Sequence, residues 1–255
     1  MLNTSLKSTE ELRKIIPTFF PETIMWSNYI TVFERFDFFT YLRNTLIVGV
    51  LSTLGTLITT IFAAFAFARL NFKGRDLLFS LFIATMMIPG EVLVITNYVT
   101  VCSENVLGWY NTYEAMIIPF WVSTYYIFLL RNTFKQIPNE LYYAAKVDGT
   151  SDFKYLLKVM LPIASPTIIT ITILKLMGAW NSYIWPNLVT DASLGKDLTL
   201  ITVGLRKAFT ADDGLLPQTN LQMAATTVVT VPLLLVFIFF RKYIIKGVSR
   251  SGIKG

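Results

Sequence analysis

Long stretches without a charged residue dominate the hydrophobic pattern of this chain. Residues 44–68 and 214–240 contain no Lys, Arg, Asp or Glu, and each is long enough to cross about 30 Å of hydrocarbon as an α-helix. Three less uniform apolar stretches lie between them: residues 77–102, interrupted by Glu91; residues 110–130, with Glu114 near one end; and residues 159–190, interrupted by Lys175. The pattern therefore predicts an all-α integral membrane protein with five transmembrane helices present.

The composition agrees with a membrane protein. Hydrophobic residues make up 54% of the 255 residues, and the mean hydropathy of +0.56 is too high for a soluble core. Cys102 is the only cysteine, so an internal disulfide is excluded. Because the chain has no histidine either, the composition argues against a classical zinc or haem site.

The positions of the basic residues predict the orientation. The formal net charge is +6, but the Lys and Arg residues cluster beside the ends of apolar stretches, which favours a membrane topology signal over nucleic-acid binding. The clusters are Arg69, Lys73 and Arg75 after the first stretch; Arg131, Lys135, Lys146, Lys154 and Lys158 after the third; and Arg241, Lys242, Lys246, Arg250 and Lys254 after the fifth. These segments, including the C-terminus, are expected in the cytoplasm. The loop 103–114, which has no Lys or Arg, and the loop 191–213, in which acidic and basic residues nearly balance, are expected outside.

The same alternation places residues 1–43 outside, as an external N-terminal segment before a membrane domain at 44–255. This segment has no apolar stretch that would carry it across the bilayer. We therefore expect a sixth helix upstream of Met1 in the full protein. The alternative is a protein of five spans that translocates a short N-terminal tail unaided.

The predicted cytoplasmic segment 138–160 reads as a hairpin of two short helices. Pro138, Asn139 and Glu140 are typical of a helix start, and Gly149 of a helix end in the left-handed conformation. Thr150 or Ser151 is expected to cap a second helix, whose apolar face would contain Phe153, Leu156, Leu157 and Met160, with Pro162 leading into the next span. A helix of about ten residues is only about 15 Å long, so this element would lie along the membrane surface. The residues alone leave open whether it docks a partner protein or rests on lipid.

The hairpin and the residues after it contain a spaced set of residues: Ala144, Ala145, Gly149, Val159, Leu161 and Pro162. This set resembles the motif Glu-Ala-Ala, three residues, Gly, nine residues, Ile, any residue, Leu-Pro. That motif belongs to the cytoplasmic loop of permease subunits in binding-protein-dependent ATP-binding-cassette (ABC) importers. Val159 replaces the Ile and Tyr143 replaces the Glu, which leaves Glu140 as the nearest carboxylate. The resemblance implies that Glu140, Tyr143, Ala144, Ala145, Asp148, Gly149, Leu161 and Pro162 couple the chain to an ATPase.

Along most of its length the chain is similar to the second, G-type permease of maltose and multiple-sugar importers. The similar segments are Ser5–Lys7 with Glu10–Leu12, Asn44, Ala63–Arg69, Phe72, Gly74, Met87–Pro89, Trp180–Asn181, Trp185–Pro186, Thr199–Gly204 and Lys246–Gly255. The resemblance implies a bacterial or archaeal inner-membrane permease subunit for a carbohydrate, with six helices in the full protein. It also implies two ABC ATPase subunits, an F-type permease and an extracytoplasmic solute-binding protein as partners. Sugar acids and glycerol phosphate are carried by similar permeases and stay alternatives.

The chain itself lacks a phosphate-binding loop: in the nearest match, residues 247–254, Gly252 is followed by Ile253 instead of Lys. ATP and Mg²⁺ are therefore expected on the partner ATPase, with no cofactor on this chain. An ion-coupled secondary transporter, a membrane-embedded enzyme and a scaffold subunit are the rival classes. The chain shows neither an inverted repeat nor a catalytic cluster that would favour the first two.

Several residues are candidates for the transport pathway. Glu91 and Lys175 are costly in hydrocarbon, so they are expected to face the bundle interior, a cavity or the interface, with a carboxylate as a possible partner of Lys175. Trp180, Asn181, Tyr183 and Trp185 combine flat rings with an amide, which suits a sugar. For Glu91 and Lys175, the alternative is a buried structural role or snorkelling. For the four residues 180, 181, 183 and 185, the alternative is the general enrichment of Trp and Tyr at membrane surfaces. The loop 191–213 is expected, by resemblance, to contact the binding protein.

Overall fold

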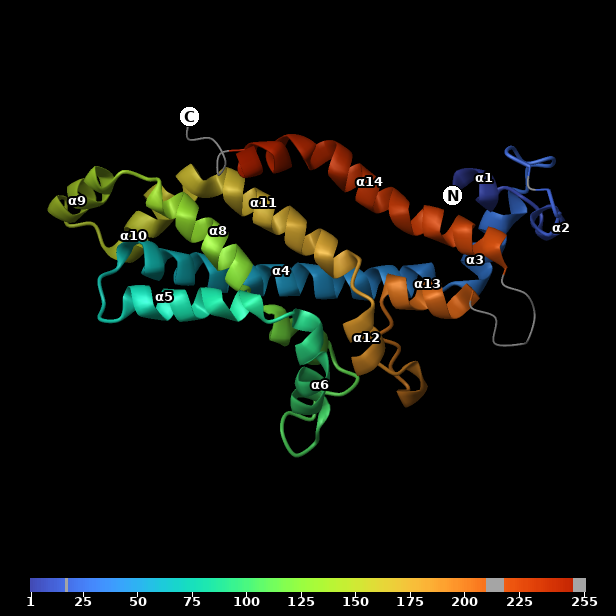
Figure 1. Cartoon of the computed structure of the whole chain (residues 1–255), viewed down its shortest axis with the longest axis horizontal. Coiled ribbons are helices and arrows are strands. Elements are labelled where there is room, and N and C mark those ends of the chain that lie inside the picture. Colours follow the sequence, from blue (N-terminus) through green and yellow to red (C-terminus); the bar gives the residue numbers. More distant parts are fainter. Residues whose placement is uncertain (17, 210–217, 250–255) are drawn as a thin grey trace. The chain divides into compact units, whose positions relative to one another are not determined.

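The computed structural model describes the chain except residues 17, 210–217 and 250–255. The described residues form helices and connecting segments without a β-strand, so the predicted all-α class is confirmed (Figure 1). The α-helices are α1 (Leu2–Ser5), α2 (Thr9–Leu12), α3 (Ser27–Arg35), α4 (Phe38–Arg69), α5 (Arg75–Ala84), α6 (Val94–Cys102), α7 (Tyr113–Ile117), α8 (Thr124–Lys135), α9 (Asn139–Val147), α10 (Asp152–Tyr155), α11 (Leu161–Trp180), α12 (Ile184–Val189), α13 (Ile201–Phe209) and α14 (Thr219–Ser249).

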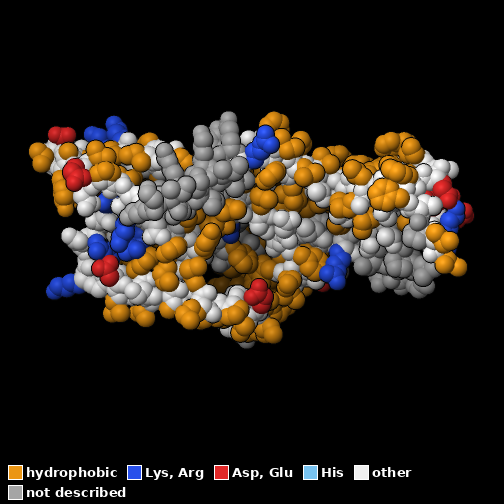
Figure 2. Space-filling model, turned by 45° about the horizontal axis from the view of Figure 1, so that its top comes forward, with side chains coloured by type: hydrophobic (Ala, Val, Ile, Leu, Met, Phe, Trp, Pro, Cys, Tyr) orange, Lys and Arg blue, Asp and Glu red, His pale blue; other side chains and the backbone are white. Residues whose placement is uncertain are grey.

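Three described helical segments are long and apolar enough to cross a membrane. They are Phe38–Arg69, Asp152–Trp180 and Thr219–Phe239. Two bent pairs raise the number of candidate spans to five if each pair counts as one: Arg75–Met87 with Gly90–Cys102, bent by 88°, and Tyr113–Phe120 with Thr124–Lys135, bent by 41°. These segments overlap the five apolar stretches of the sequence, and the number of spans stays a prediction. Hydrophobic side chains cover much of the visible face in Figure 2, as expected of a surface that contacts lipid.

The sharper bend follows from local sequence. The helix α5 tightens into the 3₁₀ turn Thr85–Met87 (η1) and ends at Ile88, which is extended with ψ of 117°. Pro89 disfavours helical geometry at the residue before it, and its own ψ of 129° continues the extended path. The chain turns helical again at Gly90–Leu93 (η2) and continues as α6. Residues 87–89 therefore form a break within this apolar stretch.

The chain folds as two compact units. Unit 1 comprises Met1–Val48, Tyr110–Tyr113 and Ala179–Phe239, and unit 2 comprises Gly49–Trp109, Glu114–Gly178 and Phe240–Gly255. The helices α4, α11 and α14 each contribute residues to both units. The division at residue 43, with the membrane domain at 44–255, stays a prediction.

The core of unit 1 joins α3 to α13 and α14. Val32 and Phe36 pack with Ile201, Leu221, Ala224, Ala225 and Val229. Gly204 permits close approach in this region, because a Cβ atom built at its position would lie 2.4 Å from the ring of Tyr41. A larger residue at Gly204 would therefore push the ring aside.

The core of unit 2 joins α4, α8, α10 and α11. Its buried residues are Ala64, Phe65, Leu130, Phe134, Ile137, Tyr155, Leu156, Met160, Ala164 and Ile171. Of the apolar face predicted for the second hairpin helix, Leu156 and Met160 belong to this core, whereas Phe153 and Leu157 are 57% and 47% exposed. The core thus holds the segment that follows α9, but it reaches α9 only through partly buried Tyr142 and Ala145.

Candidate functional site

The helix α9 carries most of the residues that the motif assigns to ATPase coupling. It begins at Asn139 after Pro138, whose φ of −57° suits a helix start, and Glu140 lies in its first turn near the positive end of the helix dipole. None of its residues is buried. Glu140, Tyr143, Ala144 and Val147 recur at i, i+3, i+4 and i+7, so they share one face, and all are exposed. The exposed fractions of Tyr143 and Val147 are 63% and 88%.

The end of α9 has the geometry that its glycine predicts. Gly149 has a φ of +69°, in the left-handed region. Its amide donates to the Lys146 carbonyl at 3.0 Å, and the Thr150 amide donates to the Ala145 carbonyl at 2.8 Å, which together form a Schellman motif. The Ser151 side chain then accepts from the Lys154 amide at 3.3 Å and caps α10. The predicted cap is therefore confirmed and is Ser151.

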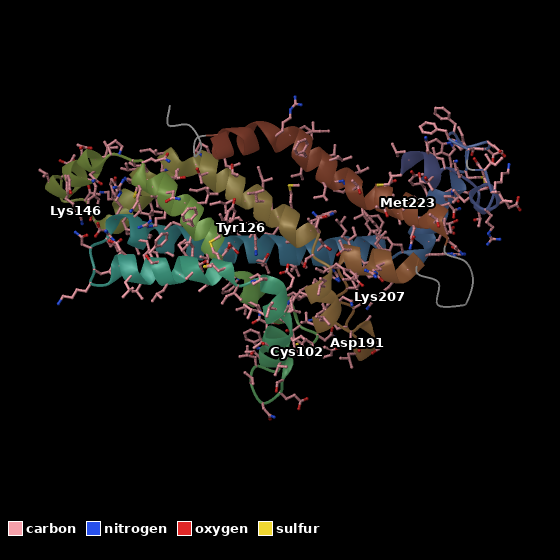
Figure 3. The ribbon with its side chains drawn as sticks, viewed as in Figure 1. Cys102, Tyr126, Lys146, Asp191, Lys207 and Met223 are labelled. Carbon is pink, nitrogen blue, oxygen red and sulfur yellow. The ribbon has the colours of Figure 1, made fainter. Side chains whose placement is uncertain are left out.

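The opposite side of α9 is tied to α10 by a small polar cluster. One carboxylate oxygen of Asp152 accepts from the Tyr142 hydroxyl and from the Lys146 ammonium, each at 2.8 Å. The Tyr142 ring also contacts the buried Tyr155 ring edge-on, with 5.1 Å between centroids. The hydrogen bond to Asp152 raises the pKa of Lys146, while desolvation, together with the carboxylate, raises the pKa of Tyr142. Figure 3 labels Lys146 on this helix.

A second anchor, at the start of α9, was not identified from the sequence. The Arg69 guanidinium, at the end of α4, donates to the carbonyls of Phe134 and Ile137 and to the side-chain oxygen of Asn139. These carbonyls belong to the last turn of α8 and the turn after it, and the Phe134 carbonyl also accepts from the Ile137 amide at 3.3 Å. The sequence indicated only that Arg69 is a cytoplasmic charge, because its acceptors lie more than 60 positions away in the chain.

The second half of the expected hairpin differs from the prediction. Instead of a separate short helix ending before Pro162, α10 continues through a π-helical turn, Leu156–Met160, into α11, so one helical segment runs from Asp152 to Trp180. The Leu161 amide donates to the Leu156 carbonyl five residues back. Such a local adjustment is a known way to keep a helix continuous next to a proline, which has no amide hydrogen to donate. Leu161 and Pro162 therefore lie within the first turn of α11 and not in a linker.

The bend before α8 is held by side chains from α4 and α11. The carbonyl of Phe120 accepts from the Thr56 hydroxyl at 2.8 Å and from the Lys175 ammonium at 3.1 Å. The indole of Trp121 covers Gly55 so closely that a Cβ atom there would lie 2.1 Å from the ring nitrogen. A carboxylate partner for Lys175 was an option from the sequence, but among the described residues it contacts the Phe120 carbonyl and ring instead.

Glu91 lies in the η2 turn that follows the 88° bend, as expected from Pro89 and Gly90. Its side chain is exposed in this single chain. The bend also lies beside the start of α8, because the hydroxyl groups of Thr85 and Thr124 are 3.3 Å apart. The two bent pairs therefore meet near their breaks, while the prediction that Glu91 faces a pathway or interface stays untested.

The aromatic group proposed for sugar contact does not share one environment. Trp180 packs against the core of unit 1, and its indole nitrogen is buried without a hydrogen-bond partner. Trp185 is buried with 7% of its surface exposed, Asn181 is exposed, and the Tyr183 ring lies 4.8 Å from the Arg206 guanidinium carbon. Packing explains Trp180 and Trp185 without a ligand, so Asn181 and Tyr183 are the better placed members of the predicted set.

The loop 191–213 is described up to its residue 209. The Asp191 carboxylate accepts from the hydroxyl and from the amide of Ser193. These hydrogen bonds, that from the hydroxyl most, lower the pKa of Asp191. Figure 3 labels Asp191 and Lys207 in this part of unit 1. The buried Asn44 amide donates to the carbonyls of Asp197 and Thr199 at 3.0 and 3.1 Å, which holds the loop on α4. Residues 210–213 of this loop and residues 250–255 of the C-terminal tail lie outside the described residues.

Comparison with known proteins gives consistent relatives. The model of the family described as binding-protein-dependent transport system inner membrane component matches residues 55–250. The arabinooligosaccharides transport system permease protein AraQ of Halalkalibacterium halodurans is 29% identical over 97% of this chain and 86% of its own length. The trehalose/maltose transport system permease protein MalG of Thermococcus litoralis is 32% identical over 89% of this chain and 81% of its own length.

A solved structure supports the fold. A chain in the crystal structure of a bacterial ABC transporter involved in the import of the acidic polysaccharide alginate matches with a TM-score of 0.76 and 24% identity. The match covers 95% of this chain and 88% of that chain. The likeness shows that the chain shares its fold with that chain.

Proposed function

The chain belongs to the family of binding-protein-dependent transport system inner membrane components, and on that premise we propose that it forms half of the pathway through which an ABC importer takes up a carbohydrate. As a permease subunit it works with an ATPase and a solute-binding protein. The proposed complex contains two ATPase subunits, one F-type permease and one extracytoplasmic binding protein in addition to this chain. The ATPases bind ATP and Mg²⁺, and this chain binds no cofactor.

The observation that carries the coupling role is the exposed face of α9. A helix with no buried residue, held on its other side by Asp152 and at its start by Arg69, presents Glu140, Tyr143 and Ala144 outward. The small side chain of Ala144 lets a partner backbone approach closely, and Glu140 and Asp148 offer polar contacts beside it. We assign this face to the ATPase groove, with Tyr143 in place of the motif Glu.

The proposed topology places α9 and the C-terminus in the cytoplasm. The distribution of Lys and Arg supports this orientation, since basic residues follow the first, third and fifth apolar stretches. Residues 138–160 form the coupling element, and the segments 1–43 and 191–213 lie on the side where the binding protein docks.

The substrate class is proposed from the relatives. The named relatives carry arabinooligosaccharides or trehalose and maltose, and the solved transporter imports alginate. Their shared chemistry is a glycosidic chain rich in hydroxyl groups. Asn181 and Tyr183 are candidates for direct contact with it, and Glu91 is a candidate for lining the pathway.

The test uses the complete transporter, purified from its native membrane and reconstituted in proteoliposomes with its binding protein. We expect uptake of at least one member of a panel of oligosaccharides, monosaccharides, sugar acids and glycerol phosphate, and we expect it to require ATP. Uptake that continues without ATP and collapses with the proton gradient would contradict an ABC importer. ATP-dependent uptake of a solute outside the carbohydrates would keep the permease role and overturn the substrate class.

A further inference from the structure

The helix α3 of unit 1 has three faces of different character. One face is buried: Asn28 and Val32 are 6% and 0% exposed, and the adjoining Phe36 is 1% exposed. A second face is polar and contains the exposed Ser27 and Glu34. A third face is apolar and exposed. A helix that only covered a protein core would need the first two faces, so the third requires an explanation.

The exposed apolar face is a stripe formed by Trp26, Ile30 and Phe33. Trp26 precedes the first residue of α3 but has helical φ and ψ of −63° and −23°, so the three residues are spaced at i, i+4 and i+7 on one side. Their exposed fractions are 66%, 62% and 48%. This apolar stripe is continuous, because neighbouring members are only one helical turn apart.

Contacts with α14 fix the position of α3 along the length of α14. The Arg35 guanidinium donates to the Gln218 side chain at 3.0 Å, and the Asn220 amide donates to the Asn28 side-chain oxygen at 3.3 Å. Figure 1 shows α3 beside the start of α14. Both acceptor and donor lie at the start of α14, whose segment Thr219–Phe239 is long and apolar enough to cross a membrane. Arg241 is the first charged residue of α14. At 1.5 Å per residue, the uncharged part of the helix before it is about 30 Å long, equal to the hydrocarbon thickness. The start of α14, and α3 beside it, therefore lie at a membrane–water boundary.

The stripe also points toward the span that follows it. The rings of Phe33 and Phe38 contact each other edge-on, with 5.5 Å between centroids, and Phe38 is the first residue of the spanning helix α4. The next residue, Phe39, is 75% exposed, and Leu46 two turns further is 49% exposed. The apolar stripe of α3 thus continues into exposed apolar side chains at the start of α4, where the exposed Arg43 lies between Phe39 and Leu46.

We propose that α3 is an interfacial helix that lies in the membrane surface at the end of unit 1 where α14 begins, with its stripe immersed in the lipid bilayer. An amphipathic helix of this kind buries its apolar face about 5–10 Å into the boundary between headgroups and acyl chains, and Trp favours that depth. Ser27 and Glu34 then face water, while Val32 and Phe36 stay in the protein core. This gives the segment before α4 a role in setting how deep the spans sit.

The test measures lipid and water contact residue by residue in the complete transporter, reconstituted in nanodiscs. Single cysteines replace Ile30, Phe33 or Glu34 in a Cys102→Ser background, and each carries a nitroxide spin label. Electron paramagnetic resonance then measures collisions with oxygen, which concentrates in lipid, and with a water-soluble nickel chelate. Glu34 is the matched control, because it lies on the same helix and is exposed on the polar side.

We expect labels at Ile30 and Phe33 to collide more with oxygen than with the nickel chelate, and the label at Glu34 to show the reverse. High collision rates with the nickel chelate at Ile30 and Phe33 would place the stripe in water and overturn the proposal. Low collision rates with both reagents at these two positions would show a protein partner on the stripe and would overturn it equally.

Discussion

Replacing Gly149 is expected to damage coupling through the backbone alone. Its φ of +69° is in the left-handed region, and no atom lies within 4 Å of a Cβ built there, so a side chain meets strain but no clash. The left-handed conformation costs a non-glycine residue about 1–2 kcal/mol. An energy of that size lowers the population of the native turn, relative to opened forms, by roughly 5- to 30-fold. Gly149→Ala isolates this cost, and Gly149→Val adds the restriction of a β-branched side chain.

The assay compares uptake with ATP hydrolysis in proteoliposomes that contain the reconstituted transporter and its binding protein. We expect Gly149→Ala and Gly149→Val to reduce substrate imported per ATP, with Val the more severe. Gly149→Asn is the matched control, because Asn tolerates left-handed geometry, and it should retain most of the uptake. Co-purification of the ATPase with each variant separates loss of coupling from loss of assembly. Wild-type uptake in Gly149→Val, or an Asn variant as defective as Ala, would refute the reasoning.

Three further predictions concern the anchors of α9 and of the bend before α8. Arg69→Gln should cost about 2 kcal/mol of stability, because buried carbonyls lose a charged donor, and should speed amide hydrogen exchange in α9; unchanged exchange would contradict the anchor. Lys146→Met should likewise loosen α9. The hydrogen bond between Lys146 and Asp152 raises the pKa of Lys146 above its ordinary 10.5 and lowers the pKa of Asp152 below its ordinary 3.8. The contribution of the pair is therefore complete between these two pH values and is lost above the raised pKa or below the lowered one, so uptake at pH 6–9 should show no titration from it. Lys175→Met should lower the stability by about 1 kcal/mol, measured by thermal unfolding in detergent. The double variant with Thr56→Val should lose more stability than the two single variants added together, because the Phe120 carbonyl then loses both the ammonium and the hydroxyl. Strict additivity would contradict the shared acceptor.

Local rules were enough to predict the ends of α9, and they explain the sharper bend. Gly149 and Ser151 act through their own backbone and the next few residues, and Pro89 restricts the residue before it, so spacing along the chain contains the needed information. The five apolar segments were predictable for the same reason, because a helix in lipid must satisfy its backbone internally and must be apolar over its whole length.

Features that depend on distant partners were not predictable. Arg69 contacts Phe134 and Ile137, and Lys175 contacts Phe120, across separations of 55 or more residues. Hydrophobic periodicity does not reveal such pairs. A carboxylate was the option that the sequence offered as the partner of Lys175, whereas the structure shows the Phe120 carbonyl. Trp180 and Trp185 look like sugar-binding residues by type, yet their packing in unit 1 follows from tertiary structure alone.

The continuity of α10 with α11 leads to a final prediction about how motion is transmitted. A separate hairpin would let α9 move without the next span, whereas the segment Asp152–Trp180 is one helix of 29 residues whose first turn is bonded to α9 through Asp152. A force on α9 is therefore expected to move α11 directly.

Interrupting that helix at Lys158, an exposed residue of the π-helical turn, tests this transmission. Lys158→Pro costs about 3 kcal/mol of helix stability and Lys158→Gly about 1 kcal/mol, whereas Lys158→Ala is the matched control with no such cost. We expect the Pro variant to keep the ATPase bound through α9 but to hydrolyse ATP without uptake, the Gly variant to be intermediate, and the Ala variant to resemble wild type. Full coupling in the Pro variant would mean that α9 drives the pathway by a route other than α11, and the coupling role of the continuous helix would then be wrong.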